Sequence, residues 1–167
     1  IGAIKNDGNG SNAGQVRIYS LNGVEPTTST NGVESSLPEA GICMTGETLV
    51  ETDQDLIQVQ DLDINFHTIR NKKIDAITKI KLHKFENNLI KICKDALGVN
   101  KPFKDLYLTN DHKIMYKNRM IRARRLCNKN IKGVEKVDYK NEILYNIVME
   151  KHSWINTQNV VIETLNP

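Results

Sequence analysis

The fold is decided by the stretch Gly41-Ile-Cys-Met-Thr-Gly-Glu-Thr-Leu-Val-Glu-Thr-Asp53, where a cysteine directly follows a region rich in glycine and small polar residues. A cysteine in this position can attack the carbonyl that precedes it and convert the Ile42–Cys43 amide into a thioester. The reactive form is the thiolate, so the site must lower the pKa of the thiol or supply a base. The reaction also needs a proton for the departing nitrogen and hydrogen-bond donors for the oxyanion.

A second stretch supplies groups of this kind in Leu106-Tyr-Leu-Thr-Asn-Asp-His-Lys-Ile-Met115. Thr109 and His112 follow a β-like run, where a tight turn can direct both side chains at one pair of atoms. A hydroxyl can hydrogen-bond the scissile amide, and an imidazole can donate a proton to its nitrogen. Two acids near these motifs, Asp111 and Asp53, are possible bases for the thiol, although a role within turns is the simpler interpretation of both.

A third stretch, residues 143–164, predicts two strands around the turn Asn156-Thr-Gln-Asn159. His152 lies just before Trp154, at the start of the first of these strands. Two interpretations of His152 stay open: it relays protons at a catalytic site, or it occupies the end of a strand.

The three stretches, in this order, resemble the sequence blocks of the Hint domain, the family shared by the hedgehog autoprocessing module and inteins. The resemblance covers about residues 43–165. It implies an all-β fold, compact and horseshoe-shaped, made of many short strands with pseudo-twofold halves. It also implies self-cleavage at Ile42–Cys43, with Cys43 as the nucleophile and with Thr109 and His112 activating the scissile amide.

The closing stretch departs from the intein pattern. An intein ends in His-Asn followed by Cys, Ser or Thr, whereas Glu163 and Thr164 occupy that place here. Asn146 stands at a position that is often acidic in inteins. We therefore expect cleavage before Cys43 without C-terminal splicing, and the thioester would pass to water or to an amine.

The spacing of β-like runs favours the same fold class without reference to any family. From Cys43 onward, short runs alternate with polar breaks every 8–12 residues or so, as in compact all-β folds. Only Arg122–Cys127 has the pattern of a helical turn. The expected strands are residues 48–52, 57–59, 67–70, 74–82, 88–94, 106–109, 113–116, 120–123, 131–137, 144–149, 153–155 and 160–165.

The chain divides into three parts. Residues 1–23 predict a β-hairpin that resembles one repeat of an integrin-type β-propeller, and residues 24–42 read as a linker. Residues 1–42 contain seven of the ten glycines, and a segment of this composition buries too little apolar surface to order itself. We expect residues 43–167 to form the Hint domain, and its own N-terminal segment to be its substrate.

Composition excludes several other classes. Hydrophobic residues make up 39% of the chain, and no apolar run approaches the length of a membrane span. A net charge of +3 gives no argument for nucleic acid as a partner. The 3 cysteines are too few for a disulfide scaffold and fit a reducing, intracellular setting.

We expect no metal and no cofactor. The sequence has no close cysteine pair of the kind that binds zinc, although Cys43, Cys127, His112 and His152 are a conceivable ligand set. The alternate oxygens of Asp7, Asn9 and Ser11 resemble part of a calcium loop that lacks its acidic last ligand.

Two other functions stay open at this point. One is a catalytically inactive Hint-like module that serves structure or protein interaction within a larger repeat-bearing protein. The other is a cysteine or metal-dependent hydrolase that acts on other proteins.

Overall fold

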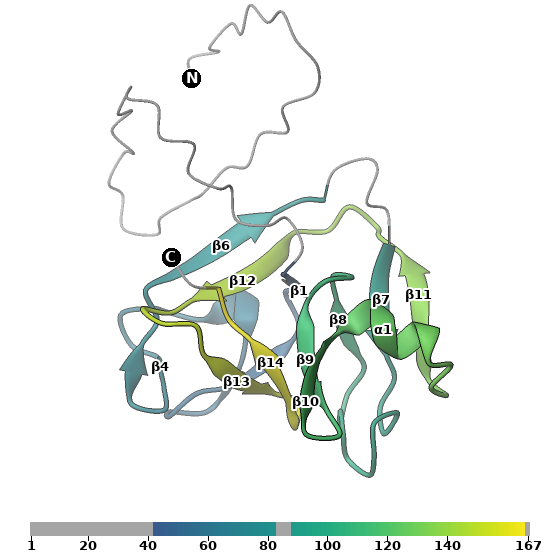
Figure 1. Cartoon of the computed structure of the whole chain (residues 1–167). Helices are drawn as coiled ribbons and strands as arrows, with labels where there is room; N and C mark the ends of the chain where they lie inside the picture. The colour runs from purple at the N-terminus through teal and green to yellow at the C-terminus, as the bar shows by residue number, and fades with distance from the viewer. Residues whose placement is uncertain (1–41, 83–87, 166–167) are drawn as a thin grey trace, which may run out of the picture.

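The computed structural model describes residues 42–82 and 88–165, and these residues form short strands with one α-helix (Figure 1). This confirms the predicted all-β fold class. The propeller-like hairpin proposed for residues 1–23 and nearly all of the linker lie outside the described residues. In chain order the elements are β1 (Met44–Thr45), β2 (Leu49–Glu51), β3 (Leu56–Gln58), the 3-10 turn η1 (Val59–Asp61), β4 (Thr68–Ile69), β5 (Lys72–Lys73), β6 (Ala76–Ile80), β7 (Asn88–Ile92), β8 (Leu106–Leu108), β9 (Lys113–Tyr116), β10 (Arg119–Arg122), α1 (Ala123–Asn128), β11 (Val134–Asp138), β12 (Leu144–Val148), β13 (Trp154–Thr157) and β14 (Val160–Glu163).

The strands build two six-stranded sheets and one small two-stranded sheet. The first sheet has the order β11-β7-β8-β1-β12-β6, and the second has the order β10-β9-β14-β13-β2-β3. Strands β4 and β5 pair only with each other. In the first sheet β1 therefore lies between β8 and β12, which come much later in the chain (Figure 1). In the second sheet β14 lies beside β9, so the end of the chain meets the Thr109–His112 region.

The strand boundaries differ from the sequence-based expectation at several points. The runs of β1 and β5 were not predicted, because two residues are too few to show alternation. Strand β11 begins at Val134 instead of residue 131, because Gly133 with a φ of 81° forms a turn before it. The helix spans Ala123–Asn128, one residue later than predicted.

Three hairpins share the same turn chemistry. The loops Arg70-Asn71, Lys117-Asn118 and Gln158-Asn159 each have two residues with positive φ, between 48° and 67°. Two such residues in a two-residue loop make the type I′ turn, whose twist matches that of the flanking strands. Asparagine occupies the second position in each case and tolerates this conformation better than most residues do.

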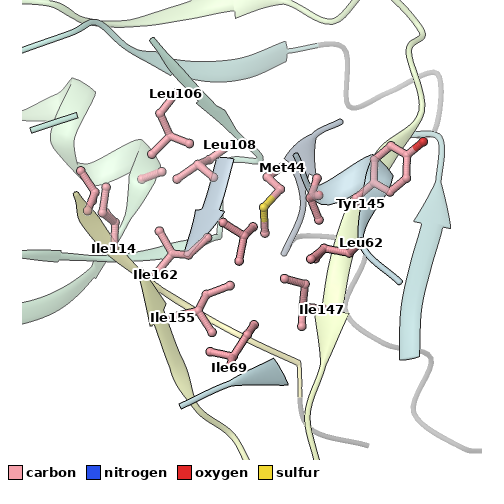
Figure 2. Close-up of a cluster of buried hydrophobic side chains, with 14 of the residues drawn as sticks. Met44, Leu62, Ile69, Leu106, Leu108, Ile114, Tyr145, Ile147, Ile155 and Ile162 are labelled. Atoms are coloured by element: carbon pink, nitrogen blue, oxygen red, sulfur yellow. The ribbon is translucent and has the colours of Figure 1, made fainter. Parts of the chain in front are cut away.

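The hydrophobic core lies between the two large sheets. Figure 2 shows side chains from both sheets converging, with Met44 and Ile147 from the first and Ile114, Ile155 and Ile162 from the second. All five are 0% exposed. Among the described residues, no helix is both long and apolar enough to cross a membrane.

The core predicts a stability test. Ile155→Ala removes a side chain that is 0% exposed, so we expect the free energy of unfolding to fall by about 2–5 kcal/mol. Val99 is 93% exposed, so the control Val99→Ala should stay within about 0.5 kcal/mol of wild type. Urea denaturation followed by circular dichroism measures both values, and equal losses in the two variants would contradict the core described here.

Candidate functional site

Strand register places Cys43 at the centre of the site. Strand β1 pairs, at Met44, with the last residue of β8 and with the second residue of β12. Both pairings are antiparallel, so the residue before Met44 falls opposite the residue after β8 and the third residue of β12. Cys43 therefore lies between Thr109 and Asn146. This position follows from backbone pairing alone, before any side-chain contact is considered.

The peptide between Ile42 and Cys43 is contacted at both its nitrogen and its oxygen. The Cys43 N–H donates to Thr109 Oγ1 at 2.8 Å, and Asn146 Nδ2 donates to the carbonyl oxygen of Ile42. Thr109 also holds the next carbonyl, because its N–H lies 2.9 Å and its hydroxyl 3.3 Å from the Cys43 oxygen. Cys43, Thr109 and Asn146 are 4%, 2% and 1% exposed. These contacts are therefore made in a site from which water is largely excluded.

His112 is fully buried between two backbone carbonyls. Its Nδ1 lies 3.2 Å from the Cys43 oxygen, and its Nε2 lies 3.1 Å from the Glu163 oxygen. A carbonyl only accepts hydrogen bonds and a neutral imidazole carries a single N–H, so only the protonated ring can donate to both oxygens. The ring is therefore placed to be stabilised when it carries an extra proton.

The pKa of His112 is nevertheless below its ordinary value. Burial, which disfavours the charged ring, is the largest cause. The carbonyls of Cys43 and Glu163 and the Glu163 carboxylate oppose it by favouring the protonated form, while the Lys113 charge lowers the pKa further. The imidazole is thus neutral near pH 7, and it can take up a proton.

Glu163 holds a buried carboxylate behind His112. Strands β9 and β14 pair Ile114 with Ile162, which brings the neighbouring residues Lys113 and Glu163 together. Glu163 Oε1 accepts from the Lys113 N–H at 2.8 Å, and Oε2 accepts from Lys113 Nζ at 2.9 Å and from His152 Nε2 at 3.2 Å. Burial alone would raise the pKa of this carboxyl. The hydrogen bonds from Lys113 and His152, with the lysine charge, outweigh burial and hold the pKa below its ordinary value.

A family model described as the Hint domain matches residues 42–167. The chain belongs to the Hint domain family. This Hint domain is also similar to a DnaB intein from Synechocystis sp. PCC 6803, known from a 2.0 Å crystal structure. The TM-score is 0.48 at 11% sequence identity, and the match covers 74% of this chain and 99% of that chain. A comparison with curated proteins gave no match.

In this Hint domain, the two acids considered as bases for the Cys43 thiol, Asp111 and Asp53, bind other groups. Asp111 Oδ1 lies 3.4 Å from Arg122 Nε and 3.1 Å from an Arg124 guanidinium nitrogen. Asp53 accepts a hydrogen bond from the Thr68 hydroxyl at 2.6 Å and another from a backbone N–H of the β4–β5 turn at 2.7 Å. These bonds hold the pKa of Asp53 below its ordinary value. These partners agree with the simpler interpretation of both acids as parts of turns, and their role as bases stays a prediction.

Of the other residues considered from sequence, His152 lies next to the site. It reaches Glu163, whose backbone carbonyl contacts His112, and its ring meets the Trp154 ring edge-on with centroids 4.6 Å apart. Within residues 42–82 and 88–165, no three His, Cys, Asp or Glu side chains gather to hold a metal ion. The conceivable zinc ligands are therefore not brought together.

Three residues were not assigned to the site from the sequence: Asn146, Glu163 and Lys113. Asn146 and Glu163 were noted only as departures from the intein pattern. Their signal was a polar residue in the otherwise mostly apolar runs of β12 and β14, and each of the two is 1% exposed. A buried polar side chain in a central strand requires a partner, and it therefore marks a place where chain segments meet.

The Glu163 carboxylate predicts a pH-dependent stability difference. Its folded pKa lies below the unfolded value of about 4.3, so the ionised group stabilises the fold fully above that value. This contribution disappears as the pH falls through the folded pKa. We expect Glu163→Gln to be less stable than wild type by about 1–3 kcal/mol at pH 7, and the difference should shrink below about pH 4.

Thermal and urea unfolding between pH 3 and pH 7 measures this difference. Glu135→Gln is the matched control, because Glu135 is paired with Lys91 at 3.7 Å and its side chain is 58% exposed. Exposed pairs of this kind contribute about 0–1 kcal/mol. A stability difference for Glu163→Gln that stays constant with pH would show that the carboxylate charge does not contribute.

Proposed function

We propose that this Hint domain cleaves its own chain between Ile42 and Cys43, releasing residues 1–42. Membership of the Hint family supports a function of the autoprocessing type in general terms. The finer assignment rests on one observation, the 2.8 Å contact between the Thr109 hydroxyl and the Cys43 amide nitrogen. A side chain that acts on a scissile amide must reach that atom, and Thr109 reaches it from within the family's second sequence block.

The first step is an N-to-S acyl shift. Cys43 loses its thiol proton, and its sulfur attacks the carbonyl carbon of Ile42. The carbon–nitrogen bond then breaks, and the nitrogen of Cys43 takes up a proton to become an amine. The amide is converted into a thioester with no net gain or loss of atoms, because the proton that leaves sulfur is balanced by the one that nitrogen receives.

His112 is suited to carry this proton. It is neutral near pH 7 because burial lowers its pKa, so it can accept the proton of the thiol. Once protonated, both of its ring N–H groups face carbonyl oxygens at 3.1–3.2 Å, and these contacts stabilise the charged ring. It lies against the carbonyl of Cys43, next to the nitrogen that needs the proton. We prefer His112 to Asp53 and Asp111 as the base for this reason.

Thr109 positions the scissile amide and assists the departing nitrogen. Its hydroxyl accepts the amide N–H and lies 3.3 Å from the Cys43 oxygen, which His112 also contacts. The Thr109 hydroxyl is therefore within reach of both the Cys43 nitrogen and the Cys43 carbonyl oxygen, and His112 contacts the latter. As the nitrogen loses its amide character it gains a lone pair, and the same hydroxyl can then donate to it.

The second step releases the N-terminal segment. Water or an amine attacks the thioester carbonyl, the carbon–sulfur bond breaks, and the Cys43 thiol is restored. Water leaves Ile42 with a carboxylate, and an amine leaves it with a new amide. We propose that no splicing follows, because Glu163 and Thr164 occupy the place of the His-Asn pair and the Glu163 carboxylate is held by Lys113 and His152.

The proposal predicts thiol- and hydroxylamine-induced cleavage. Purified full-length chain, incubated with dithiothreitol or hydroxylamine, should yield two fragments whose masses place the break between Ile42 and Cys43. Cys43→Ala should stay intact because it has no nucleophile. His112→Ala should react about 10²–10⁴-fold more slowly because the proton carrier is lost. Intact mass spectrometry over time gives the rates.

Cys127→Ala is the control, because Cys127 is a free thiol elsewhere in the fold, and it should cleave as wild type does. If the wild-type chain stays as intact as Cys43→Ala, the inactive structural module is the better description. If it instead cleaves an added protein with multiple turnovers, the hydrolase alternative is favoured.

A second prediction separates the hydroxyl of Thr109 from its shape. Thr109→Ser keeps the hydroxyl, so its cleavage rate should stay within about tenfold of wild type. Thr109→Val keeps the volume and removes the hydrogen-bonding group, so it should be slower by about 100-fold or more. Cleavage rates are measured as above, with circular dichroism to verify folding. Equal rates in the two variants would show that Thr109 acts only through packing.

A further inference from the structure

We infer that Asn146 is a catalytic residue of the acyl shift, whose side-chain amide donates to the oxyanion that forms on the Ile42 carbonyl. This inference rests on the proposed function and adds to it the group that stabilises the developing charge. Asn146 Nδ2 donates to the Ile42 oxygen, the atom that becomes negative when sulfur attacks the adjacent carbon. Thr109 and His112 contact other atoms, so the oxyanion donor is a separate role.

The position of Asn146 is fixed before the reaction begins. It is the third residue of β12, paired with Thr78 on β6, and on its other side β12 is paired with β1. Its side chain is 1% exposed. A donor held by a central strand in a buried site needs no reorganisation when charge develops, and its hydrogen bond strengthens when its acceptor becomes an anion.

The chemistry of the side chain favours an amide at this position over a carboxylate. An amide presents N–H groups to the carbonyl oxygen. An ionised aspartate of nearly the same shape would present only acceptor oxygens and a negative charge, both of which oppose an oxyanion. A protonated aspartic acid has one O–H and would restore the donor. Asparagine is therefore the form that donates at every pH.

The other end of the amide supports a role beyond structure. Asn146 Oδ1 is buried and makes no hydrogen bond among the described residues. A buried acceptor without a partner destabilises a fold, so a purely structural asparagine would be expected to pair both ends of its amide. The paired end faces the scissile carbonyl, which indicates that this contact determines the residue at this position.

Replacement of Asn146 followed over pH tests the inference. The full chain is incubated with hydroxylamine, and the cleavage rate is measured for wild type, Asn146→Ala and Asn146→Asp between pH 5 and pH 8.5. We expect Asn146→Ala to be slower by about 10²–10³-fold at all pH values. Asn146→Asp should be at least as slow at high pH, and its rate relative to wild type should rise as the pH falls and its carboxyl becomes protonated.

The pH comparison is specific because the neighbouring titratable groups are shared by all variants. Cys43 lies just before β1 and His112 contacts the Cys43 carbonyl, while Thr78 on β6 carries no charge. The ratio of rates cancels the titration of the thiol and the imidazole. Asn65→Asp, at an exposed loop position, is the control for added charge and should give a constant ratio near one.

Three outcomes are distinguishable. A wild-type chain that stays intact overturns the proposed function and this inference with it. If wild type cleaves and Asn146→Ala cleaves within about threefold of it, only the oxyanion role is wrong. If Asn146→Ala does not fold, as shown by circular dichroism, the near-isosteric Asn146→Asp decides: a ratio to wild type that does not rise at low pH contradicts the inference.

Discussion

The pairing of β1 with β8 on one side and β12 on the other is the constraint on which the site depends. Strand β1 has two residues, too few to be stable without neighbours on both sides. Met44 anchors it, because this side chain is 0% exposed within the core between the sheets. A slip of one residue would turn Met44 away from the core and move Cys43 out of line with Thr109 and Asn146. Burial of one methionine thus sets the register of the reacting peptide.

His112 links this register to the second sheet. One ring nitrogen faces Cys43, just before β1, and the other faces the backbone of Glu163, at the end of β14. The imidazole can be in place only when both sheets are correctly packed. Lys113 strengthens this arrangement because its N–H and its ammonium group both bind the Glu163 carboxylate. An interaction between adjacent strands therefore fixes the carbonyl that positions the His112 ring.

How much was predictable from sequence depends on how far apart the interacting residues lie. Thr109 and His112 share a local motif at the end of a strand, so their convergence on each other was predicted from spacing. Their approach to Cys43, 66 and 69 positions away, was implied by the resemblance to a family. Asn146 contacts a peptide 104 positions away, and only the pairing of β12 with β1 reveals this. Strand β1 itself was missed because two residues show no period.

The acids near the motifs show a different limit of sequence reasoning. Asp53 and Asp111 lie close in sequence to Cys43 or to the Thr109–His112 motif, which made them plausible bases. Hydrogen bonds direct Asp53 toward the β4–β5 turn, and ion pairs direct Asp111 toward two arginines that come later in the chain. Proximity in sequence predicts proximity in space only where the backbone geometry is known.

The peptide between Ile42 and Cys43 also has a structural role, which bears on the energetics of the proposed cleavage. Its nitrogen and oxygen are the partners of Thr109 and Asn146. Both side chains are buried, and without hydrogen bonds they would lower the stability of the fold. The intact peptide is therefore stabilised in the site, and such ground-state contacts alone do not accelerate the reaction.

Acceleration requires contacts that strengthen as the bond rearranges. The Asn146 bond becomes charge-assisted when its acceptor turns into an oxyanion, and the two carbonyls around His112 bind the ring fully only when it is protonated. In the proposed reaction, the same contacts that hold the unreacted peptide thus favour the transition state over it.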